Sequence, residues 1–371
     1  MQNQRLELKI VPGFSVGTFK LGMNLNEILK YLQVNSNIYE QVQLKYNEEY
    51  PFKNDILINL PYNGCSLRVC PYKQKLKSIE IYDLQKVTQI YGNQEYSSQK
   101  VIPTLVNICK VFGPTKRGNY NLEKSHYEHN YPGITFIFPL PKEVIDKYKN
   151  KDELPELDDG KTPVTNRVYI YAGKDWTESV FPSSKNELID GFEELNINEN
   201  FELNFPKKNV DIKLGMQSQD IIGDIGSPSN IYYKNEDKMS IHSSNKDKEE
   251  VTQITSQDYF YNYYHLGFDL LFDGLTNKIK KIILHSNFPG HFDFFKYNKC
   301  QYKFKCSSNQ VISPDVNWTD IQSILGPPLG PPIIFKREED INPFGSTHIY
   351  GYDHLLFEVM KNNYVATMTI F

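Results

Sequence analysis

Two histidines and an aspartate stand close together in residues 284–294, which read Leu-His-Ser-Asn-Phe-Pro-Gly-His-Phe-Asp-Phe. Imidazole and carboxylate groups can hold a metal ion or transfer protons near neutral pH, so His285, His291 and Asp293 are the first candidates for a chemical site. The six-position spacing of the histidines fits no standard zinc motif. We therefore favour a loop whose histidines hydrogen-bond to nearby carbonyl groups, with a metal, ligand or catalytic site as the alternative. The residues expected to shape this loop are His285, Asn287, Pro289, Gly290 and His291.

The sequence contains no nucleophile elbow, HExxH motif, Walker loop or GxGxxG motif. The nearest glycine-rich stretch, residues 326–330, contains prolines, which remove the backbone donors that a phosphate site needs. Glu358 and Asp273 occupy equivalent positions next to Phe357 and Phe272, and we expect both carboxylates to face solvent rather than to form a catalytic pair. The sequence therefore predicts no enzyme activity, no cofactor and no metal.

The composition favours a folded protein rich in strands. The chain has 371 residues, of which 22 are Phe and 26 are Tyr, too many large rings for an intrinsically disordered chain. Alanine, the strongest helix former, occurs only at Ala172 and Ala366. The 41 basic and 45 acidic side chains leave a formal charge of -4, so we expect no nucleic-acid partner.

Short helices are predicted by a repeated pattern. The tetrapeptide Lys-Leu-Gly-Met occurs at residues 20–23 and again at residues 213–216, each time ahead of an amphipathic segment. Apolar residues three or four positions apart, followed by glycine and proline, predict a helix that ends where glycine permits a positive φ. The copy after residue 23 has Gln33 in place of the glycine, so the end of its helix is left open. The predicted helix ends are Gly113, Gly226 and Gly326.

Alternating apolar and polar residues behind each helix predict antiparallel strands with one buried face. The strand segments are 64–69 with 76–82, 133–138 with 168–171, 267–272 with 279–284, and 352–357 with 365–371. The repeating unit is thus a helix, a Gly/Pro turn and a meander of about three strands, and four such units form an α+β fold arranged as two similar halves. We expect an N-terminal half at residues 1–175, a linker at 176–205 and a C-terminal half at 206–371.

Cysteine usage and the N-terminus indicate the cytoplasm. The five cysteines form no CxxC pair, as expected of reduced thiols. The first 11 residues lack the apolar core of a signal peptide, and no apolar run is long enough to span a membrane.

Two loops are candidates for a partner-binding surface. One is the insert at residues 235–257, and the other is the aligned connection in the next repeat. Apolar side chains held on loops by proline and glycine suit a binding hot spot, since little entropy is lost on contact. We hypothesise that the two loops form one surface; the alternative is that Phe344 fills the core of its own unit. The candidate contact residues are Met239, Ile241, His242, Asn342, Pro343, Phe344 and Gly345.

An aromatic run at residues 259–264, Tyr-Phe-Tyr-Asn-Tyr-Tyr, is expected to bury one set of rings and to expose the other. Exposed tyrosines on a strand are typical of a protein-binding surface. Lys278, Lys280 and Lys281 follow on a predicted hairpin. They form a small basic spot that is either a solvated edge or a peripheral contact with an acidic membrane.

Four strings carry a resemblance to a known family. They are residues 235–243 (Asn-Glu-Asp-Lys-Met-Ser-Ile-His-Ser), 258–263 (Asp-Tyr-Phe-Tyr-Asn-Tyr), 283–291 (Ile-Leu-His-Ser-Asn-Phe-Pro-Gly-His) and 342–347 (Asn-Pro-Phe-Gly-Ser-Thr). Through them the chain resembles the phagosome assembly factor 1 family over nearly its whole length, most strongly between residues 210 and 371.

The resemblance implies a non-enzymatic cytosolic adaptor in autophagy. Members of that family are eukaryotic and act with a WD40-propeller partner, breast carcinoma-amplified sequence 3, at the forming autophagosome. For this chain the resemblance therefore implies a WD40-propeller partner similar to that protein, recruitment from the cytoplasm to preautophagosomal structures, and no catalytic residues.

Overall fold

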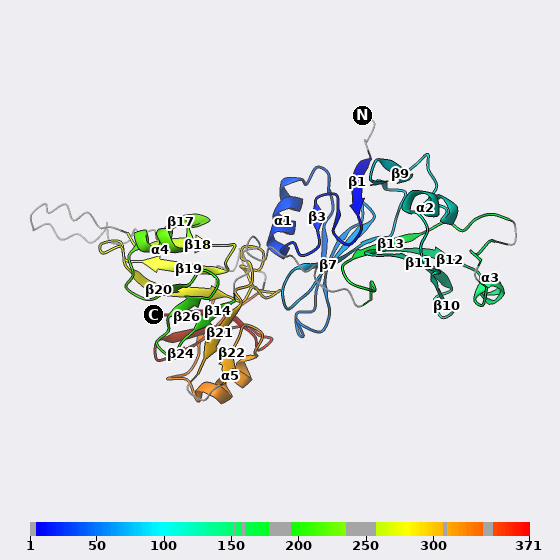
Figure 1. Cartoon of the computed structure of the whole chain (residues 1–371). Coiled ribbons are helices and arrows are strands. Elements are labelled where there is room, and N and C mark those ends of the chain that lie inside the picture. The colour runs from blue at the N-terminus through cyan, green and yellow to red at the C-terminus, as the bar shows by residue number, and fades with distance from the viewer. Residues whose placement is uncertain are drawn as a thin grey trace, which may run out of the picture. The chain divides into compact units, whose positions relative to one another are not determined.

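The computed structural model describes residues 5–151, 153–157, 160–177, 194–234, 257–306, 310–336 and 344–371. The chain forms two compact units, Met1–Lys185 and Asn186–Phe371, coloured from blue to green and from green to red in Figure 1. Within these described residues, each unit contains one eight-stranded and one five-stranded sheet. The predicted α+β fold with two similar halves is confirmed.

Each unit holds two copies of one arrangement, a helix followed by four strands. The helices are α1 (Leu25–Val34), α2 (Leu105–Phe112), α4 (Ser218–Ile225) and α5 (Trp318–Leu325), while α3 (Lys142–Tyr148) is inserted between two strands of the second copy. The strands of the first unit are β4 (Gln43–Lys45), β5 (Ile56–Leu60), β6 (Cys65–Val69) and β7 (Leu76–Ile81), then β10 (Asn119–Asn121), β11 (His126–Tyr131), β12 (Ile134–Pro139) and β13 (Arg167–Tyr171). Those of the second are β17 (Asn230–Tyr233), β18 (Tyr259–Tyr263), β19 (Phe268–Phe272) and β20 (Ile279–His285), then β23 (Ile333–Phe335), β24 (Thr347–Tyr352), β25 (Leu355–Val359) and β26 (Val365–Ile370).

The expectation of about three strands per copy is wrong by one strand. In three copies the strand directly after the helix was not expected, because at three or four residues it is too short for alternation to be recognised. The corresponding strand of the fourth copy, Ile333–Phe335, was expected. These four strands, β4, β10, β17 and β23, form the outer edges of the eight-stranded sheets.

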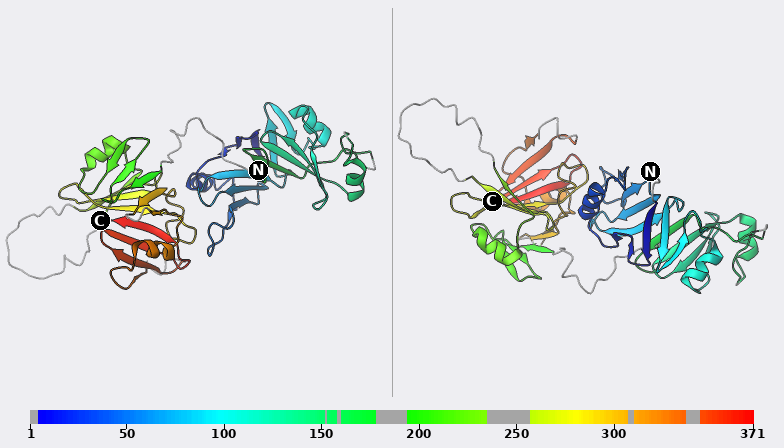
Figure 2. Two further views of the ribbon diagram at one scale, coloured as in Figure 1. Left: turned by 60° about the horizontal axis from the view of Figure 1, so that its bottom comes forward. Right: turned by 90° about the horizontal axis from the view of Figure 1, so that it is seen from above.

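Two copies join edge to edge to make each eight-stranded sheet. In the second unit the order is β17-β18-β19-β20-β26-β25-β24-β23, so the copies meet through their last strands. That junction is antiparallel, with Ile282 of β20 opposite Ile370 of β26. Figure 2 shows the yellow strands of one copy lying beside the red strands of the next. The first unit repeats this order, with β13 next to β7.

The five-stranded sheets were not expected from the sequence. They comprise β1 (Leu6–Val11), β2 (Ser15–Val16), β3 (Phe19–Lys20), β8 (Val87–Tyr91) and β9 (Gln94–Ser97) in the first unit, and β14 (Leu195–Ile197), β15 (Leu203–Phe205), β16 (Val210–Ile212), β21 (Tyr302–Lys305) and β22 (Val311–Ile312) in the second. Each contains one parallel pair, β1 with β8 or β14 with β21, and its other pairs are antiparallel. Residues 194–205 of the expected linker therefore contribute β14 and β15 to the second unit.

The repeated tetrapeptide connects the start of a helix to the last strand of its copy. Gly22 has a φ of 88° and donates its amide to the carbonyl of Leu76 at 2.8 Å. Gly215 has a φ of 83° and donates to the carbonyl of Ile279 at 2.9 Å. Positive φ favours glycine, so the glycine of the tetrapeptide is explained by its backbone conformation. In each unit the tetrapeptide lies where the segment before one helix meets the last strand of the same copy.

One continuous core fills the second unit. The five-stranded sheet supplies Phe205, the helices supply Ile221 and Trp318, and the eight-stranded sheet supplies Phe268 and Phe357. The helices and the small sheet therefore cover one face of the large sheet. The side chains that alternate with these core residues point to the opposite face of the large sheet, outside this core.

Candidate functional site

A groove with a volume of about 480 Å³ lies on the face of the second unit's large sheet that points away from the core. Along β19, Phe268 and Leu270 belong to the core, while Asp269 between them lines the groove. All eight strands contribute lining side chains, from Tyr232 on β17 to Phe335 on β23. A flat sheet of this width would span about 34 Å at about 4.8 Å per strand, so the sheet must curve around the groove.

The walls of the groove are apolar and largely aromatic. Phe260 and Tyr232 line it from one end of the sheet, and Phe335, Ile349 and Leu356 line it from the other. Tyr232 is 52 % exposed and Phe335 is 39 % exposed, so both rims present rings to solvent. The aromatic run at 259–264 divides only in part as expected: Tyr259, Tyr261 and Tyr263 are buried, but Phe260 and Tyr264 are half-buried in the groove rather than exposed.

One polar cluster on the groove floor centres on the carboxylate of Asp269. It accepts hydrogen bonds from Asn262 Nδ2 at 2.8 Å and from the hydroxyl of Tyr297 at 2.7 Å, and its Oδ2 lies 2.9 Å from Nε2 of His285. The rings of His285 and Tyr297 stack with centroids 3.7 Å apart. Burial and the neighbouring Asp269 raise the pKa of Tyr297 well above its usual range, so its hydroxyl remains a donor.

A second cluster centres on Glu358, which is buried rather than solvent-facing as expected. The carboxylate accepts from the hydroxyls of Thr347 at 2.8 Å and Thr367 at 3.1 Å, and it lies 3.3 Å from Nε2 of His291. Glu358 points to the groove face of β25, which the segment carrying His291 covers. The solvent-facing expectation failed because alternation identifies the face of a strand but not what lies over that face.

The two histidines serve separate carboxylates. Asp269 and Glu358 lie on β19 and β25, which are three strands apart, or about 14 Å. Both imidazoles contact these carboxylates rather than the loop carbonyls that we expected. In the described part of the chain, no group of three or more His, Cys, Asp or Glu side chains is arranged to hold a metal ion.

The other loop residues keep the connection close to the sheet. Asn287 and Pro289 are buried, and Asn287 has a φ of 50°. Gly290 has a φ of 85°, and the backbone amide of Asp293 donates to Nδ1 of His291 at 3.3 Å. Loop 286–299 thus brings Asp293, Lys296 and Tyr297 to the groove.

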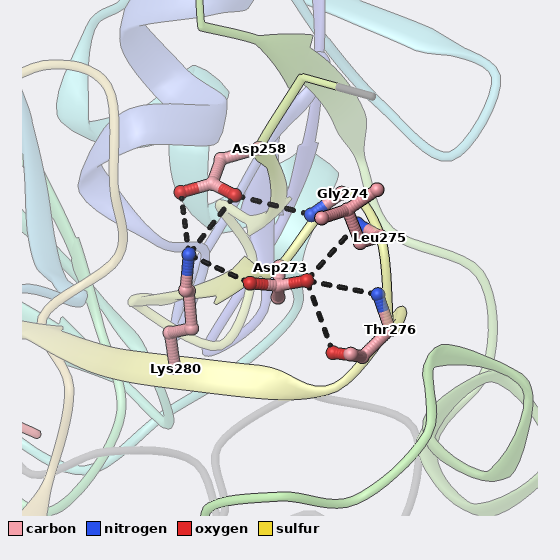
Figure 3. A network of polar contacts seen from close by, with 6 residues as sticks. All are labelled: Asp258, Asp273, Gly274, Leu275, Thr276 and Lys280. Carbon is pink, nitrogen blue, oxygen red and sulfur yellow. Dashed lines mark hydrogen bonds and ion pairs between the residues drawn. The ribbon is translucent and has the colours of Figure 1, made fainter. Parts of the chain in front are cut away.

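A charged network lies at the turn that joins β19 to β20 (Figure 3). Lys280 Nζ lies 3.1 Å from Oδ2 of Asp258 and 2.8 Å from Oδ2 of Asp273. The other oxygen of Asp273 accepts from the amides of Leu275 and Thr276 at 2.9 and 2.8 Å. Lys280, followed by the turn amides, holds the pKa of Asp273 well below its usual range. Of the predicted basic spot, Lys280 is thus paired with two carboxylates, while Lys278 and Lys281 are exposed.

Most of the predicted partner-binding residues cannot be placed. Met239, Ile241, His242, Asn342 and Pro343 lie outside the described residues. Phe344 is half-buried, and Gly345 is exposed with a φ of 83°. Both come shortly before β24, whose Ile349 lines the groove.

The profile of the phagosome assembly factor 1 family matches residues 15–371. The chain belongs to this family. A PHAF1 protein of Arabidopsis thaliana is 37% identical over 380 residues, covering 97% of this chain and 92% of the relative. A PHAF1 protein of Drosophila melanogaster is 30% identical over 417 residues, covering 99% and 94%, and one of Caenorhabditis elegans is 26% identical over 400 residues, covering 98% and 94%. No solved structure is significantly similar to the chain.

Family membership confirms the resemblance seen in the sequence. The family match covers residues 15–371 and therefore includes every residue that lines the groove. No helix among the described residues has the length and apolar character needed to cross a membrane. The groove itself was not predicted. The sequence feature that could have indicated the groove is a single acidic residue between apolar neighbours, as in Phe-Asp-Leu at residues 268–270. Which side chains surround that acid is decided by the pairing of the strands, which the sequence does not show.

Proposed function

We propose that this chain is a non-enzymatic adaptor that binds a WD40-propeller partner similar to breast carcinoma-amplified sequence 3. In this proposal it acts in the cytoplasm and is recruited to preautophagosomal structures at forming autophagosome membranes. Membership of the phagosome assembly factor 1 family supports a role in autophagy or phagosome assembly. The groove supports the more specific part, namely that the role is one of binding.

The observation that favours binding is the combination of apolar walls with fully engaged carboxylates. Asp269 receives three side-chain partners, and so does Glu358. Such networks rigidify a surface, because each member fixes the rotamer of its neighbour. A preorganised groove with aromatic walls loses little entropy when a partner enters it.

The edge strands give the same face a further means of contact. Ile333 and Ile334 on β23 are 68 % and 60 % exposed, and Tyr233 on β17 is 57 % exposed. Exposed apolar residues on an edge strand are typical of sites where another chain packs or adds a strand. Both edges border the groove, so a partner can contact the groove and an edge together.

The test is direct binding between the purified full-length chain and a purified propeller protein of the proposed kind, measured by calorimetry. An unrelated WD40 propeller serves as the control. We expect saturable binding to the first and none to the second. In starved cells the tagged chain should gather in puncta together with the propeller protein. Absence of binding in solution and of puncta in cells would refute the adaptor role.

A further inference from the structure

We infer that the groove binds a segment of the protein partner in which one cationic side chain, arginine or lysine, stands between apolar side chains. This inference rests on the proposed function, and it adds the chemical identity of what the groove accepts. It combines the charge of the groove floor, the orientation of its rings and the apolar character of its rims.

The groove is acidic. Its described lining contains the three carboxylates of Asp269, Glu358 and Asp293, against two basic side chains, Lys296 and His285. Amide and hydroxyl donors also stabilise the two floor carboxylates, and each carboxylate has one imidazole partner, His285 for Asp269 and His291 for Glu358. Charges held in a partly enclosed site act more strongly than the same charges in water. A cation entering the groove is therefore favoured, and an anion is disfavoured.

The aromatic rings already attract cations from the protein itself. Lys296 Nζ lies 5.4 Å from the ring centre of Tyr264 and 5.5 Å from that of Tyr297. Lys234 Nζ lies 5.8 Å from the ring centre of Phe260. An ammonium or guanidinium group over a ring face is stabilised by the ring quadrupole. These contacts show that aromatic faces of the groove are compatible with a cationic side chain, a feature separate from the carboxylates.

The rims select apolar neighbours for that cation. Phe335 and Ile349 line one side and Tyr232 the other, and the rings on both rims are partly exposed. A volume of about 480 Å³ is within the range of pockets that enclose a few side chains. An acidic membrane fits poorly, because anionic headgroups would approach the carboxylates of the groove floor. The charge therefore favours a protein segment over a membrane.

The experiment compares two substitutions that remove the same ring and add opposite charges. Phe335→Lys and Phe335→Glu lose the same apolar contact at the rim, but only the first places a positive charge beside the incoming cation. Leu329→Lys is the control, because Leu329 is 76 % exposed, does not line the groove and lies outside the edge strands. The probe is the purified propeller protein, titrated into each full-length variant, with thermal melting to verify folding.

We expect Phe335→Lys to weaken binding at least about tenfold more than Phe335→Glu, and Leu329→Lys to bind like the wild type. Equal weakening by the two charges would overturn the cationic occupant. Wild-type affinity in both Phe335 variants would overturn the groove as the docking site while leaving the adaptor role intact. Failure of the wild type to bind would instead refute the proposed function. Loss of binding to phosphatidylserine vesicles by Phe335→Glu, without loss of propeller binding, would assign the groove to a membrane and reject the inference.

Discussion

The hydroxyl of Tyr263 donates a hydrogen bond to the carbonyl oxygen of Gly226 at 3.0 Å. Gly226 ends α4, and Tyr263 is the last residue of β18, so the bond ties the end of the helix to the sheet. The same relationship joins Tyr352 to Gly326 at 2.7 Å and Tyr131 to Gly113 at 2.8 Å. Three copies thus satisfy a helix carbonyl that would otherwise lack an intrahelical partner.

Glycine at this helix end is expected to be required for its backbone conformation. Gly226 has a φ of 93° and a ψ of -179°, and an added Cβ would meet no atom within 4 Å, so any penalty comes from the backbone alone. Gly226→Ala should lower the free energy of unfolding by about 1 kcal/mol. The matched control is Gly223→Ala within α4, which also meets no atom and should raise stability by up to about 1 kcal/mol. Urea unfolding measures both, and equal effects of the two changes would contradict the assigned helix end.

The sequence allowed these helix ends to be predicted because the signal is local. Gly113, Gly226 and Gly326 all have positive φ, as a glycine followed by proline nearby indicates. The helix after residue 23 continues through Val34 and is capped by Asn35, which agrees with its lack of a glycine. The principal strands were predictable for the same reason, since alternation within one strand needs no knowledge of its neighbours.

The groove could not be predicted because it depends on register between distant segments. His285 lies opposite Thr367, which lies opposite Glu358, and this alignment exists only once β20, β26 and β25 are paired. Asp269 meets Tyr297 across 28 positions of sequence through the loop after β20. Composition and spacing contain no information about such pairings, so the sequence drew attention to the two histidines but did not identify their carboxylate partners.

The hydroxyl of Tyr297 is expected to stabilise the fold through Asp269. Tyr297→Phe removes a donor at 2.7 Å from a buried carboxylate, which should lower the free energy of unfolding by about 1.5–3 kcal/mol. Tyr232→Phe is the control at an exposed ring of the same groove, and its effect should stay within about 0.5 kcal/mol. Chemical unfolding of both variants measures the difference. An unchanged free energy of unfolding in Tyr297→Phe would show that the hydrogen bond from Tyr297 to Asp269 does not stabilise the fold.

Acid is expected to destabilise the first unit through His129. This residue is buried between Tyr127 and Tyr131, and burial lowers its pKa to about 4, against about 6.5 in the unfolded chain. The unfolded chain therefore binds more protons between these values. The stabilisation is complete above pH about 6.5 and is lost as the pH falls toward 4, by about 3 kcal/mol in total.

The check is a comparison of wild type with His129→Gln, which keeps hydrogen-bonding groups but does not titrate. Unfolding free energies are measured in urea from pH 4 to pH 7. The wild type should lose about 3 kcal/mol more than the variant over this interval. Parallel curves for the two proteins would mean that His129 titrates alike in the folded and unfolded states.

Both carboxylate oxygens of Asp273 are expected to stabilise the turn in Figure 3, through different contacts. One oxygen accepts from the amides of Leu275 and Thr276, and the other faces Lys280. Asp273→Asn keeps an acceptor for the amides and weakens the ion pair, whereas Asp273→Ala removes both. Amide hydrogen exchange at Leu275 and Thr276 should therefore accelerate strongly in the alanine variant and little in the asparagine variant. If both variants accelerate equally, the ion pair with Lys280 holds the turn, and Lys280→Met should then reproduce their exchange rates.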